Sequence, residues 1–291
     1  MLSYRHAFHA GNHADVLKHF VLAQTLSYFN QKDKPYWVID THAGAGMYAL
    51  DASYALQNAE FETGIAPLMA AASLPKELAD FRQLIQSINV ENKLNLYPGS
   101  PAIAQQLIRT DDKMRLFELH PSDYKLLLQN FSGKGQHFEN KRFKNNSVKI
   151  ELQDGFAGIK AILPPPTKRA AVLIDPPYEE KQDYQRVVTC IKESLQRFAT
   201  GTYIVWYPLL QRDEPLEMVK KLQHLNCSNW LNVTLSVQTP SADGFGMFGS
   251  GLFIVNPPYT LAKILDENLP SLVSLLGQDN QANFTLDTHI T

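Results

Sequence analysis

The chain has 291 residues, a formal net charge of −2, 44% hydrophobic residues and 19% charged residues. This length allows one large domain with a full hydrophobic core, and the composition is that of an ordinary globular protein. The charge excludes a global positive field, so a nucleic-acid partner would need a local basic patch. The only two cysteines, Cys190 and Cys227, lie far apart, which excludes a disulfide framework and a zinc ribbon.

The N-terminus is too rich in histidine and charge for a signal peptide. No apolar run approaches the ~20 residues that span a membrane. We therefore expect a cytoplasmic protein without membrane contact, a monomer whose residues 1–291 form one domain.

The first expected element is a helix over about residues 13–29, because apolar residues recur at helical spacing from Val16 to Val21. Lys18 and His19 are adjacent on this helix. We therefore expect at most one of them to face the core.

Histidines are frequent before and within this helix, at His6, His9, His13 and His19. No carboxylate partners them at the spacing of a metalloprotease motif, and no cysteine is near. We therefore predict no metal, and expect these histidines to be hydrogen-bonding groups that line a site.

A strand over residues 36–39 is followed by Asp40-Thr-His42-Ala-Gly44-Ala-Gly46. An acid at a strand end with glycines close behind it indicates a tight strand-to-helix turn, in which Gly44 and Gly46 let the backbone approach a ligand. The turn lacks the third glycine and the downstream acid of a dinucleotide loop, so NAD is not predicted.

Residues 48–95 are expected to form a small helical insertion, with helices near 62–72 and 76–88 and no strand before Leu94. The next helix begins at Ser100, a natural N-cap, with Pro101 in its first turn. A strand over residues 114–120 follows, with Glu118 near its end.

A basic run follows the next helix, with one acid, Glu139, against Lys134, Lys141, Arg142, Lys144 and Lys149. Such a run is typical of a solvated loop. It is also the best candidate in this chain for contacts to a phosphate backbone. The sequence leaves both interpretations open.

Two more strands end in acids: residues 148–153 lead to Asp154-Gly155, and residues 170–174 lead to Asp175-Pro176-Pro177-Tyr178. The prolines fix φ and remove two backbone donors. This pattern suits a planar ring with an amino group, which would stack on Tyr178 while its N–H groups reach Asp175 and the Pro176 carbonyl.

The remaining pattern predicts a helix, a strand and a helix, then strands at 230–238 and 252–255 and a polar tail over 278–291. The loop between the last two strands is too short for a crossover helix, so they should pair antiparallel. The second motif of this kind, Asn256-Pro-Pro-Tyr259, would then lie at the opposite sheet edge. We interpret it as a proline-terminated strand.

Four successive strands thus end with an acid, at Asp40, Glu118, Asp154 and Asp175. Open parallel sheets bind ligands at the carboxyl ends of their strands. A ribose diol suits the second acid, an adenine amino group the third, and an acceptor substrate the fourth. This layout predicts a Rossmann-like α/β fold of the class I S-adenosylmethionine-dependent methyltransferases, with a seven-stranded, mostly parallel sheet and an inserted helical subdomain.

The chain closely resembles the RlmJ family, whose members methylate N6 of one adenine in 23S ribosomal RNA. The resemblance covers residues 1 to about 261 and is carried by MLSYRHAFHAGNHADVLKH, DTHAGAG, YPGSP, ELHPSDY, DGF, IDPPYE, RFATG and NPP. It implies that Asp175 is the catalytic acceptor and that Tyr4 approaches the target base. The segment near 132–147 is longer than the family pattern.

We therefore expect catalysis by Asp175, Pro176 and Tyr178, and contact between the RNA and Tyr4 and Tyr178. The residues expected to bind S-adenosylmethionine are Lys18, His19, Asp40, His42, Gly44, Ser100, Glu118, Asp154 and Gly155.

Two alternatives remain at this stage. The same fold can methylate DNA adenine or a protein amide, since Asp-Pro-Pro-Tyr serves those acceptors too; protein-free ribosomal RNA and duplex DNA as substrates would discriminate. A non-catalytic RNA-binding module is the other alternative. The intact Asp175, Gly44 and Gly46 argue against it.

Overall fold

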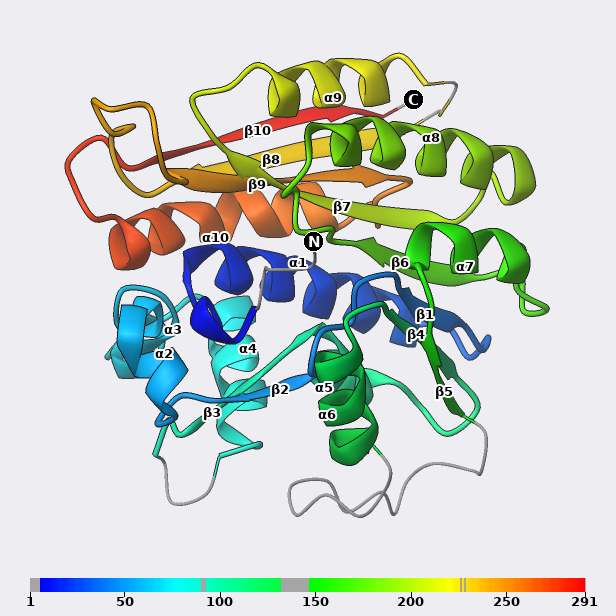
Figure 1. Ribbon diagram of the computed structural model, residues 1–291, viewed down its shortest axis with the longest axis horizontal. Helices are drawn as coiled ribbons and strands as arrows, with labels where there is room; N and C mark the ends of the chain where they lie inside the picture. Colours follow the sequence, from blue (N-terminus) through cyan, green and yellow to red (C-terminus); the bar gives the residue numbers. More distant parts are fainter. Residues whose placement is uncertain (1–5, 90–92, 132–146, 226, 228, 291) are drawn as a thin grey trace.

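The computed structural model describes residues 6–89, 93–131, 147–225, 227 and 229–290 (Figure 1). The expectation for Tyr4, and that for the basic run up to Lys144, lie outside the described residues.

One sheet of eight strands, in the order β5-β4-β1-β6-β7-β9-β8-β10, forms the centre of the molecule (Figure 1). Five strands are parallel: β1 Trp37–Asp40, β4 Lys113–Glu118, β5 Val148–Leu152, β6 Ala170–Ile174 and β7 Thr202–Leu209. Strand β9 Gly249–Val255 is antiparallel to β7 and to β8 Trp230–Ser236, which confirms the predicted hairpin.

The eighth strand, β10 Asn283–His289, pairs antiparallel with β8. The sequence predicted seven strands and a polar tail over this segment, so β10 is a correction. Phe284 and Leu286 are half-buried against the core while Thr285 between them is exposed. This alternation is that of a strand with one solvated face, and it involves too few apolar residues to stand out in a polar sequence.

Helices cover both faces of the sheet. On one face lie α1 His13–Asn30, α5 Ser100–Leu107 and α10 Leu261–Leu276; on the other lie α7 Gly155–Ile162, α8 Lys181–Arg197 and α9 Glu214–Gln223. Successive strand residues point to opposite faces, so Val38 belongs to the first core cluster and Ile39 to the second. Helix α6 Pro121–Phe131 packs beside β4 and β5.

Between β1 and β4 the chain forms α2 Ser53–Asn58, η2 Glu60–Glu62, α3 Ile65–Ala70 and α4 Lys76–Gln86. Two short strands flank these helices and pair antiparallel, β2 Met47–Ala49 and β3 Leu96–Pro98. The sequence predicted no strand before Leu94. Strand β2 was not predicted, because its three residues are too few to show the alternation of a strand. The apolar face of α4, including Phe81, belongs to the same core cluster as α1.

Helix α1 begins where predicted but is buried almost all round. Lys18 is 4% and His19 1% exposed, so the expectation that at most one of them faces inward was wrong. The helix contacts α4, α5, α10 and β9. Because protein surrounds it, its polar side chains can be buried only where other protein groups or a ligand satisfy them.

Candidate functional site

A cavity of about 550 Å³ opens at the carboxyl ends of the parallel strands. It is lined by the N-terminal turns of α1 and by the segments that follow β1, β4, β5, β6 and β7. The predicted site residues on its wall are Lys18, His19, His42, Gly44, Ser100, Glu118, Asp154, Gly155, Asp175, Pro176 and Tyr178. Asp40 is not on the wall and is 2% exposed.

Lys18 links helix α1 to the acid that follows β6. Its Nζ lies 2.6 Å from Asp175 Oδ2 and 2.9 Å from Asp15 Oδ1. Burial alone would lower the pKa of Lys18, but the charges of Asp15 and Asp175 outweigh it and raise that pKa. Lys18 is therefore a cation shared by two carboxylates. It leaves Asp175 Oδ1 free of this ion pair.

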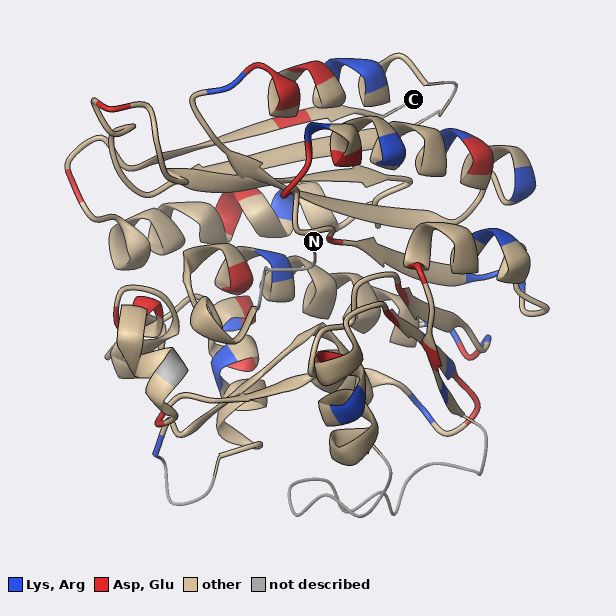
Figure 2. Cartoon of the chain, in the orientation of Figure 1, with Lys and Arg blue, Asp and Glu red and all other residues tan. Residues whose placement is uncertain are grey.

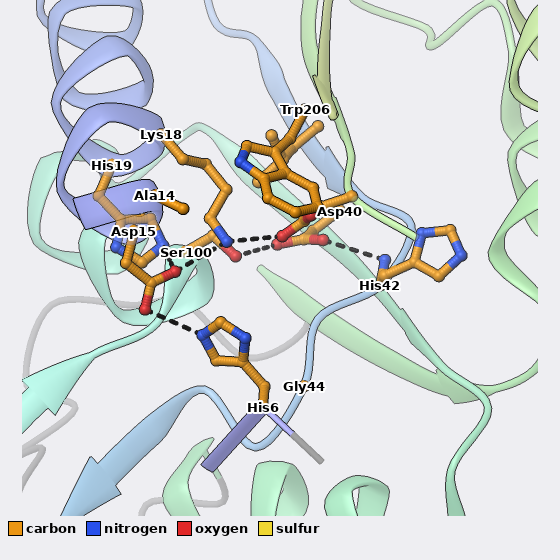
Figure 3. A network of polar contacts seen from close by, with 12 residues as sticks. His6, Ala14, Asp15, Lys18, His19, Asp40, His42, Gly44, Ser100 and Trp206 are labelled. Atoms are coloured by element: carbon orange, nitrogen blue, oxygen red, sulfur yellow. Dashed lines mark hydrogen bonds and ion pairs between the residues drawn. The ribbon is translucent and has the colours of Figure 1, made fainter. Parts of the chain in front are cut away.

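Asp15 joins the N-terminal segment to the same network (Figure 3). Its Oδ2 accepts a hydrogen bond from the Gly11 backbone N–H at 2.9 Å and lies 2.9 Å from His6 Nε2. Burial would raise the pKa of Asp15, but His6 and Lys18 hold it well below its usual range. Sequence reasoning missed Asp15. Its spacing of three residues before Lys18, one helical turn, was the available signal.

Asp40 is buried beneath the cavity and accepts two hydrogen bonds. Ser100 Oγ donates to its Oδ2 at 2.6 Å, and the His42 backbone N–H donates to its Oδ1 at 3.1 Å. Burial raises the pKa of Asp40 to about 6. The sequence predicted Ser100 as a helix N-cap, which was wrong: Gly99 occupies that position and the Ser100 hydroxyl binds Asp40 instead.

Glu118 lies half-buried at the end of β4. Its Oε2 accepts from the Gly44 N–H at 2.7 Å and its Oε1 from the His120 N–H at 2.6 Å. Burial raises the pKa of this carboxyl. Gly44 has φ +59°, and a Cβ there would come within 2.3 Å of the Tyr48 hydroxyl. The packing of Tyr48 thus favours glycine at this position. The sequence analysis gave a different reason for this glycine, the close approach of the backbone to a ligand.

Asp154 caps helix α7, because its Oδ1 accepts from the Ala157 N–H at 3.2 Å. Its Oδ2 forms an ion pair with Arg186 of α8, a cavity residue that sequence reasoning missed. Gly155 allows α7 to start against the β1 turn, since a Cβ there would meet the Thr41 carbonyl oxygen at 1.9 Å.

The two predicted cofactor histidines are held by hydroxyl groups. His19 Nδ1 lies 2.8 Å from the Tyr97 hydroxyl, and His42 Nδ1 lies 2.8 Å from Thr41 Oγ1. Desolvation lowers the pKa of His19 to about 3 and that of His42 to about 4. Both are therefore neutral near pH 7. Among the described residues, no group of three or more His, Cys, Asp and Glu side chains could hold a metal ion.

Tyr178 differs from the expected open stacking face. It is 6% exposed, with φ +52°; its ring centroid lies 4.5 Å from that of Tyr184, and its hydroxyl donates to the Trp206 carbonyl at 2.6 Å. Trp206 is half-buried and lines the cavity. The sequence analysis did not single out Trp206. In the pairing of β6 with β7, Ile174 is aligned with Val205, so the next residues, Asp175 and Trp206, lie opposite each other.

Asn256-Pro-Pro-Tyr259 lies at the other edge of the sheet, as predicted. Asn256 follows β9, and its Nδ2 donates to the carbonyls of Ala199 and Gly201, each at 2.8 Å, just before β7 begins. Its side chain thus closes a turn at the amino end of β7, away from the cavity.

If the strands of the main sheet are renumbered 1 to 8 in chain order (β1, β4, β5, β6, β7, β8, β9, β10), their order in the sheet is 3-2-1-4-5-7-6-8. The seventh strand, β9, is antiparallel to its neighbours. With a ligand-sized cavity at the carboxyl ends of the first four, this is the fold of the class I S-adenosylmethionine-dependent methyltransferases.

A family model described as "Ribosomal RNA large subunit methyltransferase D, RlmJ" matches residues 33–289. A protein named ribosomal RNA large subunit methyltransferase J from Escherichia coli is 44% identical, over 95% of this chain and 94% of its own. Its namesake from Haemophilus influenzae is 41% identical, over 99% and 98%. A crystal structure of a Legionella pneumophila protein superposes with a TM-score of 0.86 at 33% identity, covering 97% of this chain and 98% of that one. The chain belongs to the RlmJ family, as the resemblance indicated.

No helix in the described part of the chain is long and apolar enough to cross a membrane.

Proposed function

We propose that this protein is an S-adenosylmethionine-dependent methyltransferase that modifies N6 of one adenine in 23S ribosomal RNA. It acts as a monomer on unpaired or protein-free RNA. The observation that carries this proposal is Asp175, which follows β6 at the wall of a cavity that Glu118 lines from β4. Membership of the RlmJ family supports the choice of substrate.

The side chains around the cavity fit S-adenosylmethionine, which supplies a methyl group activated on a sulfonium. The volume of about 550 Å³ lies within the usual range for sites that enclose small ligands. Glu118 would accept from the ribose hydroxyls and Asp154 from the adenine amino group. Asp40, which already accepts from Ser100 and His42, would position those two residues beside the ligand.

Asp175 and the Pro176 carbonyl would receive the acceptor amino group. The exocyclic nitrogen of adenine is a poor nucleophile because its lone pair is delocalised into the ring. Hydrogen bonds from both amino protons favour a pyramidal nitrogen and stabilise the positive charge that develops during attack. Lys18 fixes Asp175 through Oδ2 at 2.6 Å, so the carboxylate is held in place before the substrate arrives.

The adenine must leave its stack to enter this cavity, which favours an unpaired segment of RNA. Trp206 lies on the wall beside Asp175, with Lys18 Nζ 5.7 Å from the centroid of its indole ring. The Tyr178 hydroxyl donates to the Trp206 backbone carbonyl, and the centroids of the two rings lie 5.9 Å apart. We therefore assign stacking on the target base to Trp206, with Tyr178 in contact with the base at its edge.

Calorimetry with S-adenosylmethionine, followed by methyl transfer to unmodified large-subunit RNA, tests the proposal. We expect cofactor binding and transfer of one methyl group per RNA to adenine N6, with protein-free RNA preferred over duplex DNA. Cofactor binding without transfer to this RNA, or preferential transfer to duplex DNA, would contradict it.

A further inference from the structure

The loop between β8 and β9 lies at the edge of the cavity, at the left of the sheet in Figure 1. Strand β9 starts at Gly249, which is paired with Leu209, the last residue of β7. The Phe248 N–H donates to the Leu209 carbonyl at 3.2 Å, and Met247 lines the cavity wall. The residues just before Met247 therefore lie next to the cavity wall.

Phe245, two residues before Met247, is 72% exposed. The loop presents it in an ordered turn, because Asp243 Oδ1 accepts from Ser241 Oγ at 2.7 Å and from the Phe245 N–H at 3.0 Å. The next residue, Gly246, has φ +89° and no atom within 4 Å of where its Cβ would lie. Phe245 is thus an exposed residue in a turn held by hydrogen bonds, and the space beside the next residue, Gly246, is open.

Two of the exposed residues on the cavity wall are acidic. Glu179 and Glu180, directly after the Asp175 motif, are exposed and line the cavity. In the described part of the chain, Lys and Arg lie on helices, strands and loops on different sides of the molecule (Figure 2). An uncharged aromatic ring suits the flat face of a base better than the anionic backbone.

We propose that Phe245 stacks on an unpaired base that neighbours the target adenine in the RNA. This inference rests on the function proposed above and adds a second binding point outside the cavity. Unpaired bases are recognised by stacking on aromatic side chains, which tolerates any base identity. Phe245 would hold the flanking nucleotide while the target adenine enters beside Asp175.

Steady-state methylation of a short RNA that contains the target adenine tests the role of Phe245. Phe245→Ala should raise KM for RNA about tenfold, a typical effect of one lost base stack, with kcat and S-adenosylmethionine affinity unchanged. Phe245→Trp should retain the wild-type KM. Tyr259, 73% exposed at the opposite sheet edge, is the matched control: Tyr259→Ala should leave KM unchanged. Equal KM values for wild type and Phe245→Ala would overturn the proposal.

RNAs with a single abasic site identify the stacked nucleotide. One abasic position beside the target should raise the wild-type KM about tenfold and leave that of Phe245→Ala unaltered, because the variant has no stack to lose. Additive effects at every abasic position would contradict the inference. Its failure differs from failure of the proposed function, since the wild type would still methylate the intact RNA.

Discussion

The chain contains two copies of nearly the same motif, Asp175-Pro-Pro-Tyr178 after β6 and Asn256-Pro-Pro-Tyr259 after β9. The first follows a parallel strand and ends at the cavity. The second follows an antiparallel strand and ends at the opposite edge. Asp175 forms an ion pair with Lys18, whereas the amide of Asn256 donates hydrogen bonds to two backbone carbonyls.

The tyrosines of the two motifs differ as well. Tyr178 is 6% exposed and its ring packs against that of Trp206. Tyr259 is 73% exposed, and among the described ring contacts it makes one, edge-on with Tyr28. A four-residue motif therefore defines a site only when strand direction brings it to the ligand edge and other elements supply partners. The following predictions test that distinction.

The largest effect is expected at Asp175. Asp175→Asn keeps the size of the side chain but removes the charge that stabilises the developing cation. Turnover should fall by ~10²-fold or more, as for loss of one preorganised electrostatic contact. S-adenosylmethionine affinity should stay within a few-fold, because Glu118 and Asp154 hold the cofactor in our proposal. Single-turnover methylation at saturating RNA measures the step, and a near-normal rate would remove Asp175 from the chemistry.

Glu118 is expected to affect binding more than chemistry. Losing a charge-assisted hydrogen-bonding partner typically costs ~1.5–3 kcal/mol, so Glu118→Ala should weaken S-adenosylmethionine by roughly one to two orders of magnitude. Turnover at saturating cofactor should change far less. Calorimetry gives the affinity. Glu193→Ala, which removes a carboxylate paired with Lys160 outside the cavity, is the control. Unchanged affinity in Glu118→Ala would exclude Glu118 from the site.

The part of this arrangement that the sequence predicted is the part with strong local signals. Apolar runs that end in acids located β1, β4, β5 and β6, and strand direction put their four acids at one edge. What it could not predict depends on contacts between distant residues. Ser100 has every feature of an N-cap, yet its hydroxyl meets Asp40, 60 positions earlier. The same holds for the bridge that Lys18 makes to Asp175, 157 positions later.

At the opposite edge, Asn256 should matter for stability and not for chemistry. Its backbone has φ +51°, which Asn tolerates better than Ala, and its amide satisfies the Ala199 and Gly201 carbonyls. Asn256→Ala should lower the free energy of unfolding by about 1–3 kcal/mol. Asn256→Gly, which relieves the backbone strain, should lose less. Denaturation curves measure both, and an unaltered curve for Asn256→Ala would contradict this role.

The pH dependence of stability should differ between the cavity and the opposite sheet edge. His19 at the cavity titrates, whereas the amide of Asn256 does not. Burial lowers the pKa of His19 to about 3 in the folded protein, against about 6.5 in an unfolded chain. The unfolded state therefore binds more protons between these values. Stability from neutral His19 is complete above pH 6.5 and is lost as the pH falls towards 3, by ~1.4 kcal/mol per pH unit.

His19→Gln should flatten the pH dependence of the unfolding free energy by that slope between pH 6 and 4. The measurement is a series of urea denaturation curves for wild type and variant across this range. Parallel stability profiles for the two proteins would show that His19 is not held neutral.

The smallest effect is expected for removal of the Tyr178 hydroxyl, with removal of the Tyr259 hydroxyl as the comparison. Tyr178→Phe removes only the hydroxyl that donates to the Trp206 carbonyl at 2.6 Å. A single hydrogen bond of this kind contributes ~1 kcal/mol, so the urea midpoint should fall with no change in slope. Tyr259→Phe, altered at an exposed ring, should leave the midpoint unchanged. If Trp206 stacks on the target adenine, Tyr178→Phe should also raise KM for RNA at temperatures where the protein is fully folded. Two tyrosine variants with equal midpoints and equal KM values would mean that the buried hydroxyl neither stabilises the fold nor supports the indole.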